Sequence, residues 1–163
     1  MNRYFLRCLL VLLASLLSAC SSFDKQWHNA AHGQGGATRW DGHWTSGKNV
    51  YANGAFHHGR LRCVLVTLPD RSLVAHFHAN WLIFSGNYDT ALQPVPAGPR
   101  RRKVREYQGT HDLPALVGGT YHYHATIEGD RFLTHYTSSY DTGTFDLRQV
   151  PPAKERTDLH AQH

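Results

Sequence analysis

Cysteine is scarce in this chain of 163 residues, which contains three. Cys8 lies within the apolar run near the start and Cys20 follows that run, so Cys63 stands alone in the body of the chain. A single thiol cannot form an internal disulfide in an oxidising compartment. The string Leu61-Arg62-Cys63-Val64-Leu65 reads as an apolar strand, and no histidine adjoins the cysteine. We therefore expect a buried, inert thiol at Cys63.

The apolar run near the N-terminus is too short to cross a membrane as a helix. It extends for ten residues, from Cys8 to Leu17, whereas a transmembrane helix needs about 20. Arg3 and Arg7 precede it, and the small pair Ser18-Ala19 follows it. A basic start, a short apolar core and small residues are typical of a signal peptide, which we place over residues 1–19.

The residues at the end of this signal carry a resemblance. The string Leu17-Ser18-Ala19-Cys20 resembles the lipobox of bacterial lipoprotein precursors. The resemblance implies diacylation of the Cys20 thiol, cleavage before it and, in many bacteria, acylation of the new amino group. Two or three acyl chains hold a protein stably at a membrane, whereas one chain holds it weakly. A cleaved secretory signal with an incidental cysteine, or an N-terminal anchor helix, is the alternative.

The residue after the lipobox bears on localisation. Gram-negative lipoproteins that stay in the inner membrane often carry aspartate there, and this chain has Ser21. The pattern resembles that of lipoproteins sorted to the outer membrane. We therefore expect a lipid-anchored protein of the cell envelope, in the outer membrane if the cell is Gram-negative.

Charge of one sign is not in large excess. Loss of the signal leaves 144 residues with 15 basic and 12 acidic side chains, a net charge of +3. This balance lacks the strong basic excess of a nucleic-acid-binding protein, so we expect no nucleic-acid partner. A chain of this length is sufficient for one domain with its own core.

Composition divides the mature chain into three parts. Residues 20–38 comprise the lipidated cysteine and a segment rich in Ser, Ala, Gly and Gln, which predicts a flexible tether. Residues 39–150 form the domain. Residues 151–163 are polar and begin with two prolines, which predicts a disordered tail.

The domain contains strand patterns and no convincing amphipathic helix. Large and small apolar residues alternate with polar ones from Leu73 to Trp81 and again from Tyr121 to Ile127. Short turn sequences separate such segments, which predicts hairpins and antiparallel pairing; they lie at residues 68–71, 128–130 and 141–143. A lone sheet would expose its apolar face and both edges. The sequence therefore predicts an all-β fold, an antiparallel meander of seven or eight strands closed into a barrel or sandwich.

Three further strings resemble small β-rich bacterial lipoproteins of a loosely calycin-like kind. They are Trp40-Asp41-Gly42-His43-Trp44, Gly119-Thr120-Tyr121-His122-Tyr123 and the stretch from Gly129 to Leu147. The resemblance covers roughly Arg39 to Arg148. It consists mostly of turn and core residues, so it implies a fold and no active site.

Histidine is abundant, with 13 in the chain. His76-Phe77-His78 and His122-Tyr123-His124 each place two imidazoles on one face of a strand, opposite the large apolar residues. If those strands pair in register, His76, His78, His122 and His124 would meet, and His135 would be near. Four imidazoles suit zinc, copper or nickel. The alternative is that these histidines are solvated or bonded to tyrosine, since no acidic residue sits at a familiar ligand spacing.

Two other groups invite a functional interpretation. The basic run Arg100, Arg101, Arg102 and Lys103 ends a proline-rich loop and is a candidate for binding phosphate or an acidic headgroup. A solvated basic loop is the alternative.

A catalytic triad is suggested by Ser138, Ser139, Asp141 and His135. We reject it because they lie too close along one hairpin and because no Gly-x-Ser-x-Gly elbow is present.

These observations favour a membrane-anchored, non-enzymatic binding or envelope-structural module. Its expected partners are the membrane, through lipid at Cys20, and a small amphipathic ligand or an envelope component. No cofactor is expected. The alternative is a histidine-rich metal-binding protein or metal-dependent enzyme of the envelope, with zinc or another imidazole-preferring metal.

Overall fold

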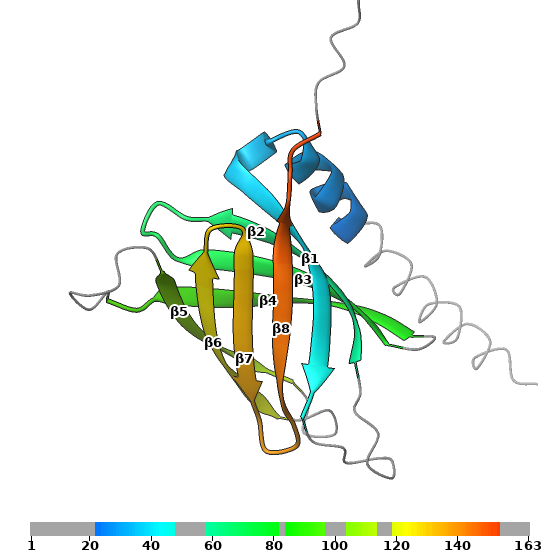
Figure 1. Ribbon diagram of the computed structural model, residues 1–163, viewed down its shortest axis with the longest axis vertical. Coiled ribbons are helices and arrows are strands. Elements are labelled where there is room, and N and C mark those ends of the chain that lie inside the picture. The colour runs from blue at the N-terminus through cyan, green and yellow to red at the C-terminus, as the bar shows by residue number, and fades with distance from the viewer. Residues whose placement is uncertain (1–21, 48–57, 82–83, 97–103, 114–118, 154–163) are drawn as a thin grey trace, which may run out of the picture.

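The protein is a closed antiparallel β-barrel (Figure 1). Its computed structural model describes residues 22–47, 58–81, 84–96, 104–113 and 119–153. The strands are β1 (Ala37–Ser46), β2 (His58–Thr67), β3 (Leu73–Trp81), β4 (Phe84–Pro94), β5 (Arg105–Asp112), β6 (Thr120–Glu128), β7 (Arg131–Thr137) and β8 (Thr142–Val150). Each strand pairs with its neighbours in the sequence, and β1 also pairs with β8. The predicted all-β meander is therefore confirmed. Of the two predicted architectures, barrel and sandwich, the sheet forms the barrel.

The alternation of side chains along the strands separates an inner from an outer face. On β3, Leu73, Ala75 and Phe77 are buried inside, whereas His76 lies on the outer face. Phe77 contacts Phe145 inside the barrel, with ring centroids 5.4 Å apart. An eight-stranded barrel is just wide enough for its own side chains to fill it. The buried core comprises Trp40, Leu61, Cys63, Leu65, Leu73, Ala75, Phe77, Leu92, Tyr107, Tyr123, Ala125, Ile127, Phe132, Tyr136, Phe145 and Leu147.

One seam in the barrel wall is weakly paired. β4 and β5 match at Gln93↔Gln108 and Pro94↔Tyr107, and Val95 adds a backbone bond of 2.8 Å to Glu106. The other neighbouring strands pair over most of their length. From Phe84 to Leu92, β4 pairs with β3 alone. Gly109 of β5 still lies against the Ala91 backbone, so β4 and β5 separate from Phe84 to about Thr90. Side chains rather than backbone hydrogen bonds form the wall there.

A helix lies on the outer wall where the sequence predicts a flexible tether. Residues 22–31 are helical, and Phe23 is 3% exposed. Phe23, Trp27 and Ala30 recur at helical spacing and pack with Val64 of β2. This apolar stripe explains the difference, because it gives an otherwise polar segment one face to bury. A short 3-10 turn, η1 (Gln34–Gly36), joins the helix to β1.

The C-terminal end of the described chain lies against the end of this helix. The amide of Ala153 donates to the carbonyl oxygen of Ala31 at 2.9 Å, and the Arg39 guanidinium donates to the carbonyl oxygen of Pro151 at 2.7 Å. The first three residues of the predicted tail are thus held on the barrel. Residues 154–163 and the predicted signal at 1–19 lie outside the described residues. Within the described part, no helix has the length and apolar character to cross a bilayer.

Gly143 of β8 occupies a position where the wall has no room for a side chain. A Cβ there would meet the Thr45 backbone oxygen and the Tyr136 ring. We expect Gly143→Ala to lower the free energy of unfolding by about 2 kcal/mol or more, because backbone and a packed ring must shift. Urea unfolding followed by tryptophan fluorescence measures this.

Gly86→Ala of β4 is the matched control. A Cβ at Gly86 meets nothing within 4 Å. We expect the change in stability to stay within about 1 kcal/mol, since the alanine mainly restricts the unfolded chain. Equal destabilisation by both substitutions would contradict the packing described for Gly143.

Candidate functional site

A pocket of about 290 Å³ opens in the barrel side where β4 and β5 separate. It is lined by Ser22, Phe23, Gln26, His76, Phe77, Asn87, Tyr88, Asp89 and His111. Phe77, Tyr88 and His111 belong to the inner faces of their strands, whereas His76 and Asp89 belong to the outer faces. The pocket therefore extends from the outer wall toward the barrel interior, with the N-terminal helix along one side.

His76 and Asp89 form an oriented polar pair at the mouth of this pocket. They are directly opposite each other across β3 and β4, and His76 Nδ1 lies 2.8 Å from Asp89 Oδ1. The carboxylate holds a proton on Nδ1, which leaves Nε2 of the neutral ring as an acceptor. The Asp89 side chain is 65% exposed, so the pair adds little to stability. It is positioned instead to bind a polar group from solution.

His78 lies two residues along the same outer face and serves a different purpose. Its Nδ1 donates to Asn87 Oδ1 at 2.6 Å, because an amide oxygen can only accept. The Phe23 ring covers it, with centroids 5.1 Å apart and planes 25° from parallel. His78 is therefore part of the contact between helix and barrel, and it also positions Asn87 in the pocket wall.

Aromatic rings line the inner end of the pocket. Tyr88 stacks on Phe77 at 5.1 Å and contacts His111 at 5.7 Å, measured between ring centroids. Burial raises the pKa of Tyr88 well above its ordinary value, and the nearby Tyr123 and Cys63 add to the shift. Tyr88 thus keeps its proton, and its hydroxyl is hydrogen-bonded to Tyr123 inside the barrel. An aromatic base and a polar mouth together suit a small amphipathic molecule.

The helix that flanks the pocket is held by cation–π contacts as well as by burial. The Arg62 guanidinium lies 5.2 Å from the Phe23 ring centroid and 5.4 Å from that of Trp27. The guanidinium carbon of Arg39 also lies 5.4 Å from the Trp27 ring centroid. Arg62 also pairs with Asp24 at 3.4 Å. Because cation–π contacts with partly buried rings are favourable, these arginines fix the helix on β1 and β2.

The four histidines predicted as one metal site lie on two separate strands. His76 and His78 are on β3, which pairs with β2 and β4, whereas His122 and His124 are on β6, which pairs with β5 and β7. Three strand spacings between β3 and β6 amount to roughly 14 Å, too far for a single ion with bonds of about 2 Å. The condition for their convergence, direct pairing of these two strands, is not met, because two further strands intervene in the ring.

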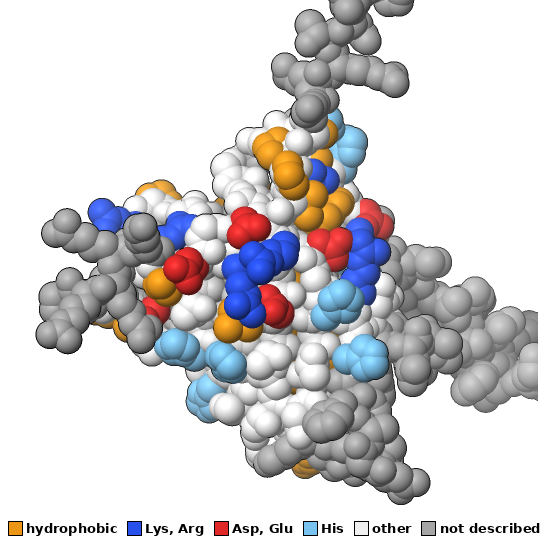
Figure 2. Space-filling model, viewed as in Figure 1, with side chains coloured by type: hydrophobic (Ala, Val, Ile, Leu, Met, Phe, Trp, Pro, Cys, Tyr) orange, Lys and Arg blue, Asp and Glu red, His pale blue; other side chains and the backbone are white. Residues whose placement is uncertain are grey.

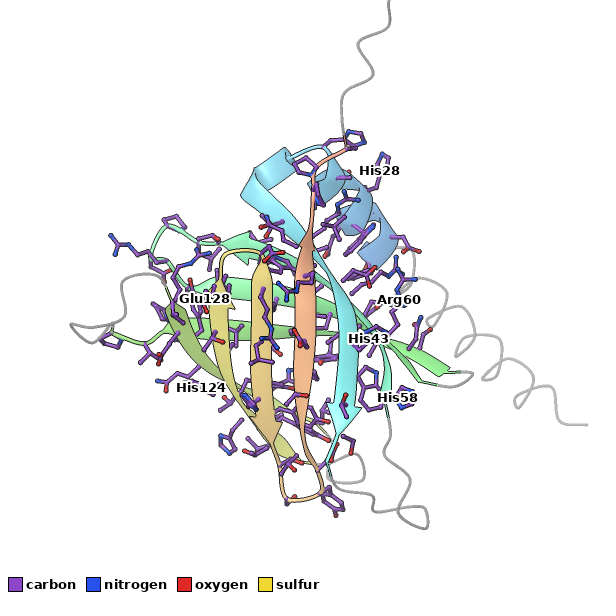
Figure 3. All side chains as sticks on the ribbon, in the orientation of Figure 1. His28, His43, His58, Arg60, His124 and Glu128 are labelled. Atoms are coloured by element: carbon purple, nitrogen blue, oxygen red, sulfur yellow. The ribbon has the colours of Figure 1, made fainter. Side chains whose placement is uncertain are left out.

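His124 instead faces His135 across β6 and β7, as the sequence suggests for that hairpin. Its Nε2 lies 3.8 Å from Glu106 Oε2, and its side chain is 55% exposed on the outer wall (Figure 3). Among the residues that the structure describes, no group of three or more His, Cys, Asp or Glu side chains is arranged to hold a metal ion.

The remaining predicted site residues are not placed. Cys20 and the basic run of Arg100, Arg101, Arg102 and Lys103 lie outside the described residues.

The residues of the rejected triad have a structural role. Asp141 accepts hydrogen bonds from Ser46 and Tyr136, and its backbone amide donates to the Ser138 hydroxyl. These bonds fasten the turn between β7 and β8.

Paired charges occupy the outer face of β7, β8 and β1, where Figure 2 shows basic and acidic side chains interleaved. Arg131 binds both carboxylate oxygens of Asp146, at 3.0 and 2.7 Å, and Arg60 binds Asp41 in the same way. Such exposed ion pairs satisfy one another across strands. The charged side chains of this face are therefore engaged with one another.

Phe23→Ala tests whether the helix is held on the barrel as described. We expect amide exchange in residues 24–31 to accelerate by about ten- to a hundredfold, because burial of one large ring provides much of the local stability. Hydrogen exchange with mass spectrometry measures it. Lys25→Ala, on the exposed side of the same helix, is the control and should change exchange little. Equal rates in both variants would contradict the docking.

Comparison with known proteins assigns no relative to this chain. No family model, curated protein or solved structure matches it. The function proposed for the protein therefore rests on the resemblance of residues 17–20 to a lipobox and on the pocket at the β4–β5 seam.

Proposed function

We propose that this protein is a lipid-anchored binding module of the bacterial cell envelope that takes a small amphipathic ligand in the side pocket. The single observation that carries the binding function is the opening of an otherwise closed wall at the β4–β5 seam. Aromatic rings and oriented polar groups converge at that opening.

The chemistry of the lining defines the ligand class. Phe77 and Tyr88 contribute aromatic surface to the lining, while Asn87, His111 and the His76–Asp89 pair contribute polar groups. A pocket of about 290 Å³ is at the small end of ligand sites. The ligand is therefore a compact molecule with one flat apolar part and one polar part.

Anchoring is the second component of the proposal, supported by the lipobox at Leu17-Ser18-Ala19-Cys20. The protein is attached to the envelope membrane by acyl chains on Cys20, and in a Gram-negative cell this is the outer membrane. Attachment concentrates the module at one surface. A binding protein held there samples ligands of the envelope rather than of the medium.

Filling the pocket tests the binding function. We expect the uncharged aromatic dye N-phenyl-1-naphthylamine to bind the intact protein saturably, with an increase in fluorescence. His111→Trp places bulk in the pocket and should weaken binding at least about tenfold, equivalent to about 1.4 kcal/mol. His135→Trp, on the outer face of β7, is the matched control and should leave the dissociation constant unchanged. Equal affinity of the two variants would refute the pocket as the binding site.

Metabolic labelling with a palmitate analogue tests the anchor. The intact protein should incorporate label, pellet with membranes and run at the size of a 144-residue chain. Cys20→Ala should incorporate none, because the acyl chains are carried by that sulfur. The variant stays membrane-bound if its signal is not cleaved, so incorporation of label is the decisive readout. Equal labelling of both forms would show that Cys20 is not the lipidated residue.

A further inference from the structure

The helix of residues 22–31 crosses the outside of the barrel in a defined direction. At its start, Ser22 and Phe23 line the pocket together with residues of β3 and β4. Trp27, in its middle, contacts Arg39 of β1 and Arg62 of β2. At its end, Ala31 bonds the backbone beyond β8. The chain therefore leaves the described structure at the wall formed by β3 and β4, beside the pocket.

The distance from this exit point to the lipidated cysteine is short. Ser22 is the second residue after Cys20, and two residues span at most about 7 Å of extended chain. Because Phe23 is buried against the barrel, little free chain exists between the acyl group and the folded domain. The domain cannot stand away from the membrane as it would on a flexible tether.

We infer that the barrel lies with the wall of β3 and β4 against the bilayer, so that the side pocket faces the phospholipid headgroups. This inference rests on the proposed lipidation of Cys20. The opposite wall, centred on β7, then faces away from the membrane, since β7 is four strands from β3 in either direction around the ring of eight. Figure 3 shows His28 of the helix and Arg60 of β2 on one side of the barrel and His124 of β6 on the other.

The anchor, rather than surface charge, determines this orientation. On the membrane side, Asp24 pairs with Arg62 and the Asp89 carboxylate contacts His76, so these groups supply no basic excess. A surface without a basic excess gains little from an anionic bilayer, and its attraction is screened by salt. The orientation should therefore persist at high ionic strength, unlike that of a protein held by a basic patch.

Fluorescence quenching in vesicles measures the orientation directly. The full lipidated chain, carrying Asp89→Cys on β4 or His135→Cys on β7, is labelled with a small fluorophore. It is then reconstituted into phosphatidylethanolamine and phosphatidylglycerol vesicles that contain a headgroup-nitroxide lipid. Cys63 does not compete for label, because it is fully buried and burial raises its pKa. We expect several-fold stronger quenching at position 89 than at position 135, both at low and at high salt.

Undocking the helix supplies the control. Phe23→Ser with Trp27→Ser should leave the protein on the vesicles but equalise quenching at the two positions, whereas Lys25→Ser with His28→Ser should preserve the difference. Equal quenching at both positions of the otherwise unchanged protein, or stronger quenching at position 135, would overturn the inferred orientation while leaving the anchor intact. Failure of the protein to associate with vesicles would overturn the anchor itself, and the orientation with it.

Discussion

The pairing of β1 with both β2 and β8 is the constraint on which the rest of the structure depends. It closes the sheet, so that open strand edges are confined to the β4–β5 seam. Closure also gives each strand one face toward the core and one toward solvent. The aromatic core, the outer ion pairs and the polar pocket mouth all follow from that division. The single weak seam, between β4 and β5, becomes significant because the remainder of the ring is continuously paired.

Properties of the fold that depend on local periodicity were predictable from the sequence. Phe77 and Tyr123 lie inside the barrel with their flanking histidines outside, as alternation on β3 and β6 requires. β5 was not predictable in this way, because Tyr107 is its one fully buried side chain and its remaining residues are mainly polar. The helix was missed for a related reason: Phe23 and Trp27 are isolated within a segment whose composition resembles a linker.

The candidate site shows where local information ends. His76 was identified as a polar outer residue, but its partner Asp89 depends on the register between β3 and β4, which the sequence between them does not reveal. The same limit affected the proposed cluster of four imidazoles. Whether His78 approaches His122 is decided by the order of strands around the ring, and β4 and β5 separate them. By contrast, His124 and His135 belong to one short hairpin, so their proximity was accessible.

The docked helix has a mechanical consequence under the proposed anchoring at Cys20. β1 follows the helix after only a short turn and closes the barrel through both of its neighbours. Tension applied at Cys20 would otherwise reach β1 directly and peel it from the ring one hydrogen bond at a time. With Phe23 and Trp27 seated against the wall, the same tension loads the helix in shear, where many contacts must fail together. Under the proposed anchoring, the helix thus protects β1, the strand that closes the barrel, from tension applied at the membrane.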